Sequence, residues 1–428
     1  MSDQRASETV ELRGHVMNSG LLSQVLDEIV ERGCDYEITR LDVGKRHTDA
    51  SYVALRLEAN DADELRALVE RLQSYGANPA TDEDATLEPS SVAGVFPEGF
   101  YSTTNLPTRI RIDGGWVDVA NPEMDCGIVY DAATRTARTL PMDDLEAGMQ
   151  VVCGVGGIKV SPRQRQRADS DGTGFAFMSS EISSEKPQGL LVERVADGMR
   201  QCKAAGRKVL WVAGPALVHT GSVPATCALI RAGYMDMLFA GNALATHDIE
   251  ANLFGTSLGV SLSHGIPTEH GHEHHVRAIN RIRRSGSIAA AVDDGTLDGG
   301  IMWHTVRHGV DVVLAGSVRD DGPLPDVIRD AVTAQAAMRR RVPEVGFALM
   351  VATLLHSIAT GNMLPAHVPL VCVDINPASV TKLVDRGSVQ SIGIVTDVGL
   401  FIGELAQRLA PDELEREPSR YGMTARSL

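Results

Sequence analysis

Cysteine, lysine, aromatic residues and long apolar runs are all scarce in this 428-residue chain. Its 6 cysteines are scattered without a C-x-x-C pair, which argues against a zinc ribbon or redox dithiol and predicts reduced thiols in the cytoplasm. The longest apolar stretch, Val345–Leu355, is shorter than the roughly 20 residues that cross a bilayer, so we expect no membrane span. The polar N-terminus MSDQRASETVEL predicts no signal peptide.

Positive charge is also in deficit, because 40 lysines and arginines face 56 aspartates and glutamates, a formal net charge of −16. Nucleic-acid binding needs a basic surface, so we expect no nucleic-acid partner. The acidic balance instead suits a cationic small molecule. The chain is 43% hydrophobic and 22% charged, as expected for a soluble protein with a packed core, and its length allows two or three domains.

Residues 1–90 are predicted to form a ferredoxin-like α+β domain. A strand over 9–17 precedes apolar residues at helical spacing over 21–30. The segment 52–59 alternates as a half-buried strand does, and Asp61 has the character of a helix N-cap. The resulting order β-α-β-β-α is typical of ferredoxin-like or regulatory folds.

Residues 91–187 are predicted to form a small β-rich domain on the substrate side, together with a linker. Strand signals broken by glycine and proline run through 95–165. Two flanking stretches look different: 81–94 is acidic and made of small residues, as a linker would be, and 163–187 is polar, as a loop or linker would be.

Residues 188–428 alternate short apolar runs with helical patterns, which predicts a mainly parallel sheet with helices on both faces. The apolar runs are Val209–Ala213, Met235–Ala240, Val310–Ala315, Leu370–Asp374 and Ile392–Thr396. Ligands in such folds bind beyond the C-terminal ends of the strands. Residues that directly follow these runs are therefore the functional candidates.

Asp374 is the first candidate, because an acidic residue at a strand tip can accept hydrogen bonds from the ribose hydroxyls of NAD and would repel the phosphate of NADP. The alternative is that Asp374 only caps the next helix. Just upstream, Thr353 and Ser357 could add hydroxyl donors to a pyrophosphate at a helix start, while His356 could also be an ordinary half-buried histidine. A G-x-G-x-x-G fingerprint is absent, so an NAD site here must be of another type.

Two further strand tips carry small or polar residues. Asn242 and Ala243 could let a flat ring or a diphosphate approach closely, although asparagine before a helix is also a common cap. Asp320 and Asp321 could hold ribose hydroxyls or a substrate ammonium, although D-D-G-P is also a strong turn sequence.

A histidine-rich stretch, TEHGHEHH, contains His270, His272, His274 and His275. Its spacing matches neither H-E-x-x-H nor a zinc finger, so we predict no metal site. A catalytic or substrate-contacting imidazole and a solvated loop are the two alternatives that stay open.

Three residues before the predicted NAD domain are candidates for substrate contacts. Glu123 and Asp125 could bind the ammonium groups of a diamino acid. Lys159 could clamp a carboxylate, or act as a base if burial lowers its pKa. Cys126 has no visible partner base, so a thiolate nucleophile is not favoured.

Several of these segments together resemble one family. They are AGNALATHDIEANLFGTSLG, HHVRAINRIRRSGSI, GIMWHTVRHGVDVVLAGSVRDDGPLPDV, ATLLHSIATGNMLP and VCVDINPASVTKLVDRG. The chain is similar along nearly its whole length to the archaeal-type ornithine cyclodeaminases, the proteins of the LOR/SDH conserved region. In that family G-G-H-x-N-H precedes RAIN, whereas here histidine replaces the first glycine and the asparagine, at His270 and His274.

The resemblance implies an enzyme that converts L-ornithine to L-proline and ammonia with tightly held NAD, in a Rossmann-like domain of the deoxyhypusine-synthase type. By motif, the implied cofactor contacts are Asn242, Ala243, Asp321, Thr353, Leu354, Leu355, His356, Asp374, Asp397 and Val398. A consistent mechanism is a borrowed hydride: NAD oxidises ornithine at Cα, the side-chain amine closes a five-membered ring, ammonia leaves, and the hydride returns. In this hypothesis Lys159 clamps the carboxylate, and Glu123 or Asp125 serves the ammonium and proton transfer.

Two other functions stay open. One is a net amino-acid dehydrogenase of the saccharopine type, and the other is a regulatory protein that senses a nucleotide and an amino acid. Ornithine and lysine differ by a methylene, which is worth only about 1–3 kcal/mol of discrimination, so the diamino acid itself also stays open. We expect a homo-oligomer, a dimer or a tetramer.

Overall fold

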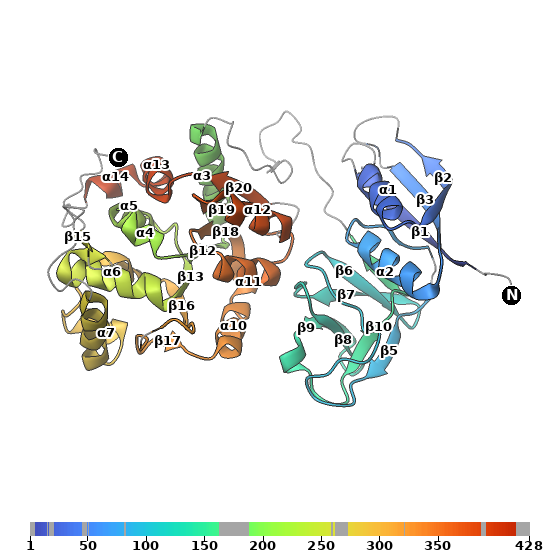
Figure 1. Cartoon of the computed structure of the whole chain (residues 1–428), viewed down its shortest axis with the longest axis horizontal. Coiled ribbons are helices and arrows are strands. Elements are labelled where there is room, and N and C mark those ends of the chain that lie inside the picture. The colour runs from blue at the N-terminus through green and yellow to red at the C-terminus, as the bar shows by residue number, and fades with distance from the viewer. Residues whose placement is uncertain are drawn as a thin grey trace. The chain divides into compact units, whose positions relative to one another are not determined.

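A computed structural model describes residues 5–14, 16, 21–44, 49, 51–80, 83–161, 188–257, 260–261, 273–320, 322–386 and 391–416. The chain forms two compact units (Figure 1). Unit 1 contains Met1–Ala176 and Asn362–His367, and unit 2 contains Phe177–Gly361 and Val368–Leu428.

Unit 1 opens with a four-stranded antiparallel sheet of order β2-β3-β1-β4. Its elements are β1 (Ala6–Gly14), α1 (Leu21–Glu31), β2 (Asp35–Asp42), β3 (Ser51–Ala59), α2 (Ala62–Gln73) and β4 (Asn78–Pro79). This order of strands and helices is the ferredoxin-like arrangement that the sequence predicts. The predicted N-cap is also present, since the Asp61 carboxylate accepts a hydrogen bond from Glu64 N–H at 2.8 Å.

Strand β1 has one buried and one open face. Val10 and Leu12 are buried against both helices, in a core that includes Ile29 and Leu68. Because successive side chains of a strand point to opposite faces, Glu11 on β1 points away from these helices. The open face of this sheet is therefore polar.

The second sheet of unit 1 has seven strands in the order β11-β6-β7-β9-β8-β10-β5. The strands are β5 (Thr86–Pro89), β6 (Thr108–Ile112), β7 (Gly115–Ala120), β8 (Gly127–Asp131), β9 (Thr136–Leu140), β10 (Gln150–Cys153) and β11 (Ile158–Val160), with a 3₁₀ turn at Met142–Asp144. The β-rich prediction for this part is confirmed. The linker prediction for 81–94 is wrong at 86–89, because β5 pairs with β10 along its whole length.

A short segment from far along the chain completes unit 1. Asn105 Nδ2 donates to the carbonyl of Leu364, and Ala366 N–H donates back to the carbonyl of Asn105. Ala366 is buried in the core of the seven-stranded sheet. This segment follows helix α11 (Leu355–Met363), so the chain returns to unit 1 after that helix.

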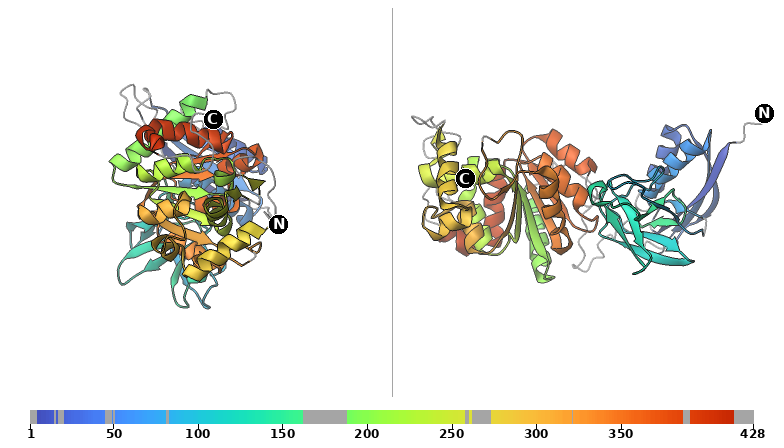
Figure 2. Two further views of the ribbon diagram at one scale, coloured as in Figure 1. Left: turned by 90° about the vertical axis from the view of Figure 1, so that its left-hand side faces the viewer. Right: turned by 90° about the horizontal axis from the view of Figure 1, so that it is seen from below.

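Unit 2 is built on a parallel sheet of order β17-β16-β13-β12-β18-β19-β20, with helices on both faces (Figure 2). The strands are β12 (Lys208–Ala213), β13 (Met237–Gly241), β16 (Asp311–Ala315), β17 (Val327–Ile328), β18 (Val345–Val351), β19 (Leu370–Asp374) and β20 (Ser391–Val395), and β14 (Thr256–Ser257) pairs with β15 (Val260–Ser261). Besides α11, the helices are α3 (Gln188–Ala204), α4 (Ala216–His219), α5 (Val223–Arg231), α6 (Asn242–Phe254), α7 (His274–Ser285), α8 (Ile288–Asp293), α9 (Gly300–Arg307), α10 (Ala331–Arg339), α12 (Pro377–Arg386), α13 (Val398–Leu409) and α14 (Pro411–Glu415), with a 3₁₀ turn at Val342–Glu344.

Numbered in chain order without the edge strand β17, the sheet reads 3-2-1-4-5-6, the Rossmann order. The order reverses between β12 and β18, and ligands bind at that point in such folds. The predicted α/β class with a mainly parallel sheet is therefore confirmed. One central strand was not among the predicted runs: β18 lies inside the longest apolar stretch, Val345–Leu355, for which no strand was predicted.

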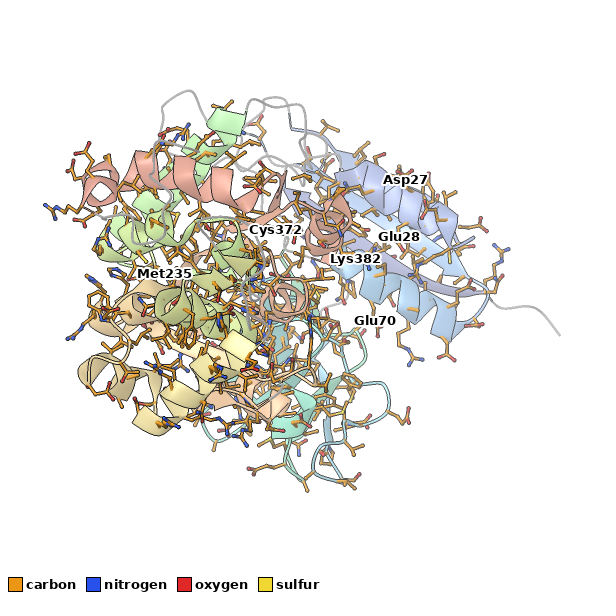
Figure 3. The ribbon with its side chains drawn as sticks, turned by 60° about the vertical axis from the view of Figure 1, so that its left-hand side comes forward. Asp27, Glu28, Glu70, Met235, Cys372 and Lys382 are labelled. Carbon is orange, nitrogen blue, oxygen red and sulfur yellow. The ribbon has the colours of Figure 1, made fainter. Side chains whose placement is uncertain are left out.

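Strand β19 packs against helix α12. Cys372 on β19 packs with Val380 and Leu383 of α12. Figure 3 labels Cys372, and it also labels Lys382, the residue before Leu383 on α12. Burial raises the pKa of the Cys372 thiol to about 12, so this cysteine stays a neutral apolar residue.

Among the described residues, no helix is both long and apolar enough to cross a membrane.

Candidate functional site

Three strand tips of unit 2 meet at the imidazole of His356. A Cβ atom on Gly241 would lie 3.2 Å from His356 Cε1 and 3.8 Å from the carbonyl oxygen of Ala315. Gly241 ends β13 and Ala315 ends β16, while His356 follows β18, so its ring reaches past β12 to β13. Burial lowers the pKa of His356, against an opposing effect of the Asp320 carboxylate, which favours a neutral ring.

The start of α6 presents an amide and backbone donors beside this imidazole. Asn242 is buried, and its Oδ1 accepts hydrogen bonds from Leu324 N–H at 3.0 Å and Thr246 Oγ1 at 3.3 Å. Because these bonds occupy the oxygen, the remaining hydrogen-bonding capacity of the amide lies in its NH₂ group. Gly241 supplies no side-chain cap, and Ala243 is exposed in the first turn. The first turn of α6 is therefore suited to an anionic or acceptor-rich ligand.

The backbone is compact where the strand order reverses. A Cβ atom on Gly214, directly after β12, would lie 2.0 Å from the carbonyl oxygen of Ala352, so only glycine fits there. Ala352 itself has φ +49°, and Thr353 and Leu354 then lead into α11. The β12 and β18 turns thus touch each other.

Two side chains of α11 are polar and fully buried. Among the described residues, the buried hydroxyls of Ser357 and Thr360 find no hydrogen-bond partner. Buried polar groups are normally paired with protein, water or ligand. Thr353 Oγ1 lies 3.5 Å from His356 Nδ1, so it also faces this group of residues.

At the next strand, Asp374 is the last residue of β19. Its Oδ1 accepts a hydrogen bond from Asn376 N–H at 2.8 Å, while Asn376 Oδ1 caps α12 through Ala378 N–H at 3.0 Å. The alternative in which Asp374 caps the helix is thus wrong, because Asn376 does so. In contrast, Asp397 is the N-cap of α13, accepting from Leu400 N–H at 3.0 Å, and Val398 is the first helical residue.

These positions line one edge of one sheet. Asn242 follows β13 and Asp374 ends β19, and these strands lie three places apart in the order, a separation of about 14 Å at the usual strand spacing. Exposed apolar side chains gather along the same edge, at Val318, Leu355, Ile375 and Leu400. An extended ligand with flat apolar rings and polar links suits such a surface.

Three of the candidate residues, Asp321, His270 and His272, lie outside the described residues.

The acidic candidates of unit 1 lie in a tight loop between β7 and β8. Asp125 has φ +61° and donates its N–H to the carbonyl of Thr103 at 3.0 Å. Thr103 Oγ1 donates to the carbonyl of Glu123 at 2.6 Å, and Glu123 is buried. Asn362 Nδ2 lies 3.4 Å from Asp125 Oδ2, and Met124 N–H donates to the Asn362 carbonyl. The C-terminal end of α11 thus lies beside Asp125.

Lys159 lies elsewhere in unit 1. It is on β11, between the buried Ile158 and Val160, and its side chain lies over Trp116 with Nζ 4.5 Å from the ring centre. It lines a cavity that neither Glu123 nor Asp125 lines. The structure therefore does not bring Lys159 together with the two carboxylates.

Sequence reasoning missed a buried proton-bearing pair on α6. His247 Nδ1 lies 3.0 Å from Glu250 Oε2, and Glu250 is fully buried. Thr256 Oγ1 donates to Glu250 Oε1 at 2.9 Å and lies 2.8 Å from His274 Nδ1. The ring of His219, which follows β12, lies 5.1 Å from that of His247. The i,i+3 spacing of histidine and glutamate in a helical segment was a visible signal, but the burial was not.

Comparison with known proteins places residues 7–405 in one family. Residues 7–106 match the LOR/SDH bifunctional enzyme conserved region. Residues 107–192 match the first region, and residues 193–405 the Rossmann-fold region, of the C-terminal part of arginine dihydrolase ArgZ-like proteins. An ornithine cyclodeaminase of Methanopyrus kandleri is 49% identical over 94% of this chain and 97% of its own length.

Solved structures agree with this placement. The apo structure of ArgZ, a cyanobacterial arginine dihydrolase, is 36% identical, with a TM-score of 0.83 over 95% of this chain and 59% of that one. The complex of AgrE with ornithine and NAD⁺ is 40% identical, with a TM-score of 0.51 over 95% of this chain and 59% of that one.

The order of the strands in the unit 2 sheet defines a Rossmann-fold protein. The chain belongs to the LOR/SDH family. Its relatives from Methanopyrus kandleri and Methanothermobacter thermautotrophicus are named ornithine cyclodeaminases.

Proposed function

We propose that this protein converts L-ornithine to L-proline and ammonia with NAD held at the C-terminal edge of the unit 2 sheet. The meeting of Gly241, Asn242 and His356 at that edge is the observation that carries the proposal. It is supported by relatives named ornithine cyclodeaminase that match nearly the whole chain, and by the complex of AgrE with ornithine and NAD⁺.

The residues proposed to hold NAD come from successive strand tips. They are Asn242, Ala243, Asp321, Thr353, Leu354, Leu355, His356, Asp374, Asp397 and Val398. Asn242 and the start of α11 are suited to the phosphates, and the Asp374 carboxylate to a ribose diol. When bound, NAD supplies reversible hydride transfer at the substrate Cα, so that the overall reaction consumes no oxidant.

The substrate's ammonium groups are assigned to Glu123 and Asp125. Asp125 is held from both sides, since its N–H is bonded to Thr103 and its carboxylate faces the Asn362 amide. A fixed carboxylate can hold the diamine folded, which makes closure of a five-membered ring entropically easy. We leave Lys159 out of this set, because Arg13 and Arg109 line the same cavity and would repel a substrate with two ammonium groups.

The proton acceptor that we assign is His247. An ionised Glu250 can only accept hydrogen bonds, so it holds the proton on His247 Nδ1 and leaves Nε2 as the basic atom. His247 lies five residues after Asn242 on α6, about 8 Å further along the helix. Glu250 acts through His247 and is a positioning residue.

One experiment tests the proposed function. Purified protein is denatured, the released nucleotide is identified, and native protein is then assayed with ornithine and no added NAD. We expect NAD, together with proline and ammonia in equal amounts and no lasting NADH absorbance. A saccharopine-type dehydrogenase would instead accumulate NADH when NAD is supplied. Protein that neither retains NAD nor makes proline would overturn the proposal. The remaining alternative would then be a regulatory protein that senses a nucleotide and an amino acid.

We also propose that the enzyme works in the cytoplasm as a homo-oligomer. All six cysteines are buried free thiols, as expected for a reducing compartment. Light scattering on the purified protein should give a dimer or a tetramer, and a monomer at working concentration would contradict this.

A further inference from the structure

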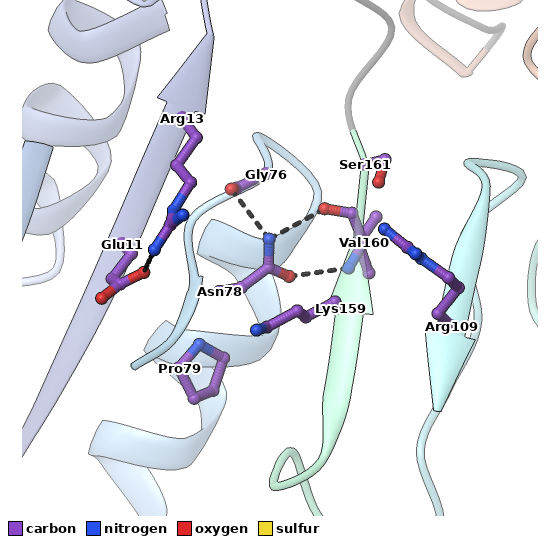
Figure 4. A pocket seen from close by; sticks show the side chains of 9 residues that line it. All are labelled: Glu11, Arg13, Gly76, Asn78, Pro79, Arg109, Lys159, Val160 and Ser161. Atoms are coloured by element: carbon purple, nitrogen blue, oxygen red, sulfur yellow. Dashed lines mark hydrogen bonds and ion pairs between the residues drawn. The ribbon is translucent and has the colours of Figure 1, made fainter. Parts of the chain in front are cut away.

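The cavity of unit 1 is lined by polar side chains that bond within that unit (Figure 4). Asn78 bonds to the backbone of Gly76 and Val160, which joins β4 to β11. On β1, Glu11 pairs with Arg13. Unit 2 contains a polar network of another kind, because its histidines can gain and lose a proton near neutral pH.

The histidine-rich stretch of the sequence reaches the buried acid of α6 through His274. This residue is the first of α7, and its Nδ1 lies 2.8 Å from Thr256 Oγ1 on β14. Thr256 Oγ1 also donates to Glu250 Oε1 at 2.9 Å. The ring of His274 stacks on that of Phe254, with 4.9 Å between the ring centres. Two contacts therefore hold the His274 ring against α6 and β14.

Donor and acceptor roles in this network follow from the protons available. An ionised carboxylate only accepts hydrogen bonds, so the single hydroxyl proton of Thr256 goes to Glu250. Thr256 Oγ1 must then accept from the imidazole of His274, which puts a proton on Nδ1 of that ring. His247 Nδ1 donates to the second oxygen of the carboxylate. One carboxylate thus fixes the Nδ1 proton of two histidines, one directly and the other through a hydroxyl.

Burial makes the Thr256 hydroxyl important for the orientation of this carboxylate. Glu250 has no exposed surface, and Thr256 is 2% exposed. A buried acceptor that loses its donor gains no replacement from water, so the loss is costly. Without the hydroxyl, the Glu250 carboxylate is free to turn toward His274 and away from His247. The hydroxyl therefore directs the second carboxylate oxygen at His247.

We infer that Thr256 and His274 are positioning residues for the proton acceptor His247. His274 holds the Thr256 hydroxyl, and this hydroxyl holds one oxygen of the Glu250 carboxylate. The other oxygen keeps the proton on His247 Nδ1, so the lone pair of Nε2 can take a proton from a substrate ammonium and leave an amine. This inference rests on the proposed function, in which His247 takes that proton.

Nuclear magnetic resonance of the full-length protein with ¹⁵N-labelled histidine tests the positioning without reference to turnover. Spectra are recorded at mildly alkaline pH, where an ordinary imidazole is neutral, and the His247 signals are those lost in His247→Gln. We expect the Nδ1–H tautomer at His247 in wild type and a mixture of both tautomers in Thr256→Val. Thr256→Ser, which keeps the hydroxyl, should show the wild-type tautomer. His274→Phe should show a smaller amount of the second tautomer.

Proline formation from ornithine is measured on the same samples. Thr256→Val should lower kcat about tenfold and change KM less than about twofold, because the base is misplaced while the substrate contacts are intact. Thr256→Ser should restore kcat. His274→Phe keeps the stacking on Phe254 but removes the donor, so it should lower kcat about threefold, whereas His274→Asn retains an N–H donor and should restore it.

Thr226→Val is the matched control, because Thr226 is also fully buried but its hydroxyl donates to the Ser222 carbonyl at the start of α5. It should leave the His247 tautomer and kcat unchanged. Mixed tautomers in wild type would overturn the inference, as would the wild-type tautomer in whichever of Thr256→Val and His274→Phe folds. Absence of proline from every sample would contradict the proposed function instead, and the spectra would still decide the positioning.

Discussion

Glu250 Oε2 lies 3.0 Å from His247 Nδ1, one turn further along α6, and no part of Glu250 is exposed. A carboxylate is rarely buried unless hydrogen-bonded partners satisfy it, and here His247 and Thr256 do so. The pair therefore holds one imidazole in a single tautomer, about 8 Å along α6 from the helix start at Asn242.

His247→Ala is expected to lower kcat for ornithine by a factor of about 10²–10⁴, the usual contribution of a proton-transfer group. Retained NAD should be unchanged, and added imidazole should restore part of the rate, because it replaces the lost base. Glu250→Gln should lower kcat more than it raises KM. His308→Ala, at an exposed histidine that ends α9, is the matched control. Full activity of His247→Ala would remove this residue from the mechanism.

Gly241→Ala tests whether the His356 ring shapes the cofactor edge. The new Cβ would lie 3.2 Å from His356 Cε1, so the imidazole must shift. We expect about tenfold weaker NAD retention, measured by nucleotide released on denaturation against a titration series. In a His356→Ala background the same change should have a much smaller effect, a coupling of about 1 kcal/mol. Equal effects in both backgrounds would show that the two residues act independently.

Asp125→Asn tests the proposed ammonium contact. The substitution keeps the shape of the side chain, and asparagine tolerates the φ of +61° found here. We expect KM for ornithine to rise by tenfold or more, since a charge-assisted hydrogen bond of about 1.5–3 kcal/mol is lost. Asp113→Asn, at an exposed turn with φ +50°, is the control for charge and backbone. Unchanged kinetics in Asp125→Asn would exclude a role in substrate binding.

The buried His304 side chain should make the free energy of unfolding depend on pH. Burial, together with the charge of Arg231, lowers the pKa of His304 to about 4, whereas an unfolded histidine titrates near 6.5. The unfolded state therefore binds the extra proton first, so stability is full above pH 6.5 and falls as pH drops toward 4. From pH 7 to pH 5 this group should remove about 2 kcal/mol. Urea unfolding of wild type and His304→Gln should show the smaller pH dependence in the variant, and parallel curves would contradict this.

Local patterns were enough to predict many elements. The helix start at Asp61, the strand Leu370–Asp374 and the parallel class of unit 2 all follow from capping and apolar periodicity, which act over a few residues. The central strand β18 was missed because a run buried on both faces has no periodicity that separates strand from helix. Strand β5 was missed because its four residues, TLEP, are too few to show an alternating pattern, and they pair at the edge of a sheet.

The sequence by itself determined which residues follow strands, and so which side chains lie at the ligand edge of the sheet. Only the tertiary structure decided which of them meet. His356 reaches Gly241, Asn362 reaches Asp125, and Lys159 lies apart from both acidic candidates, because strand order and the return of the chain after α11 are long-range features. Periodicity reports the faces of single elements, whereas contacts between elements depend on how the whole chain packs.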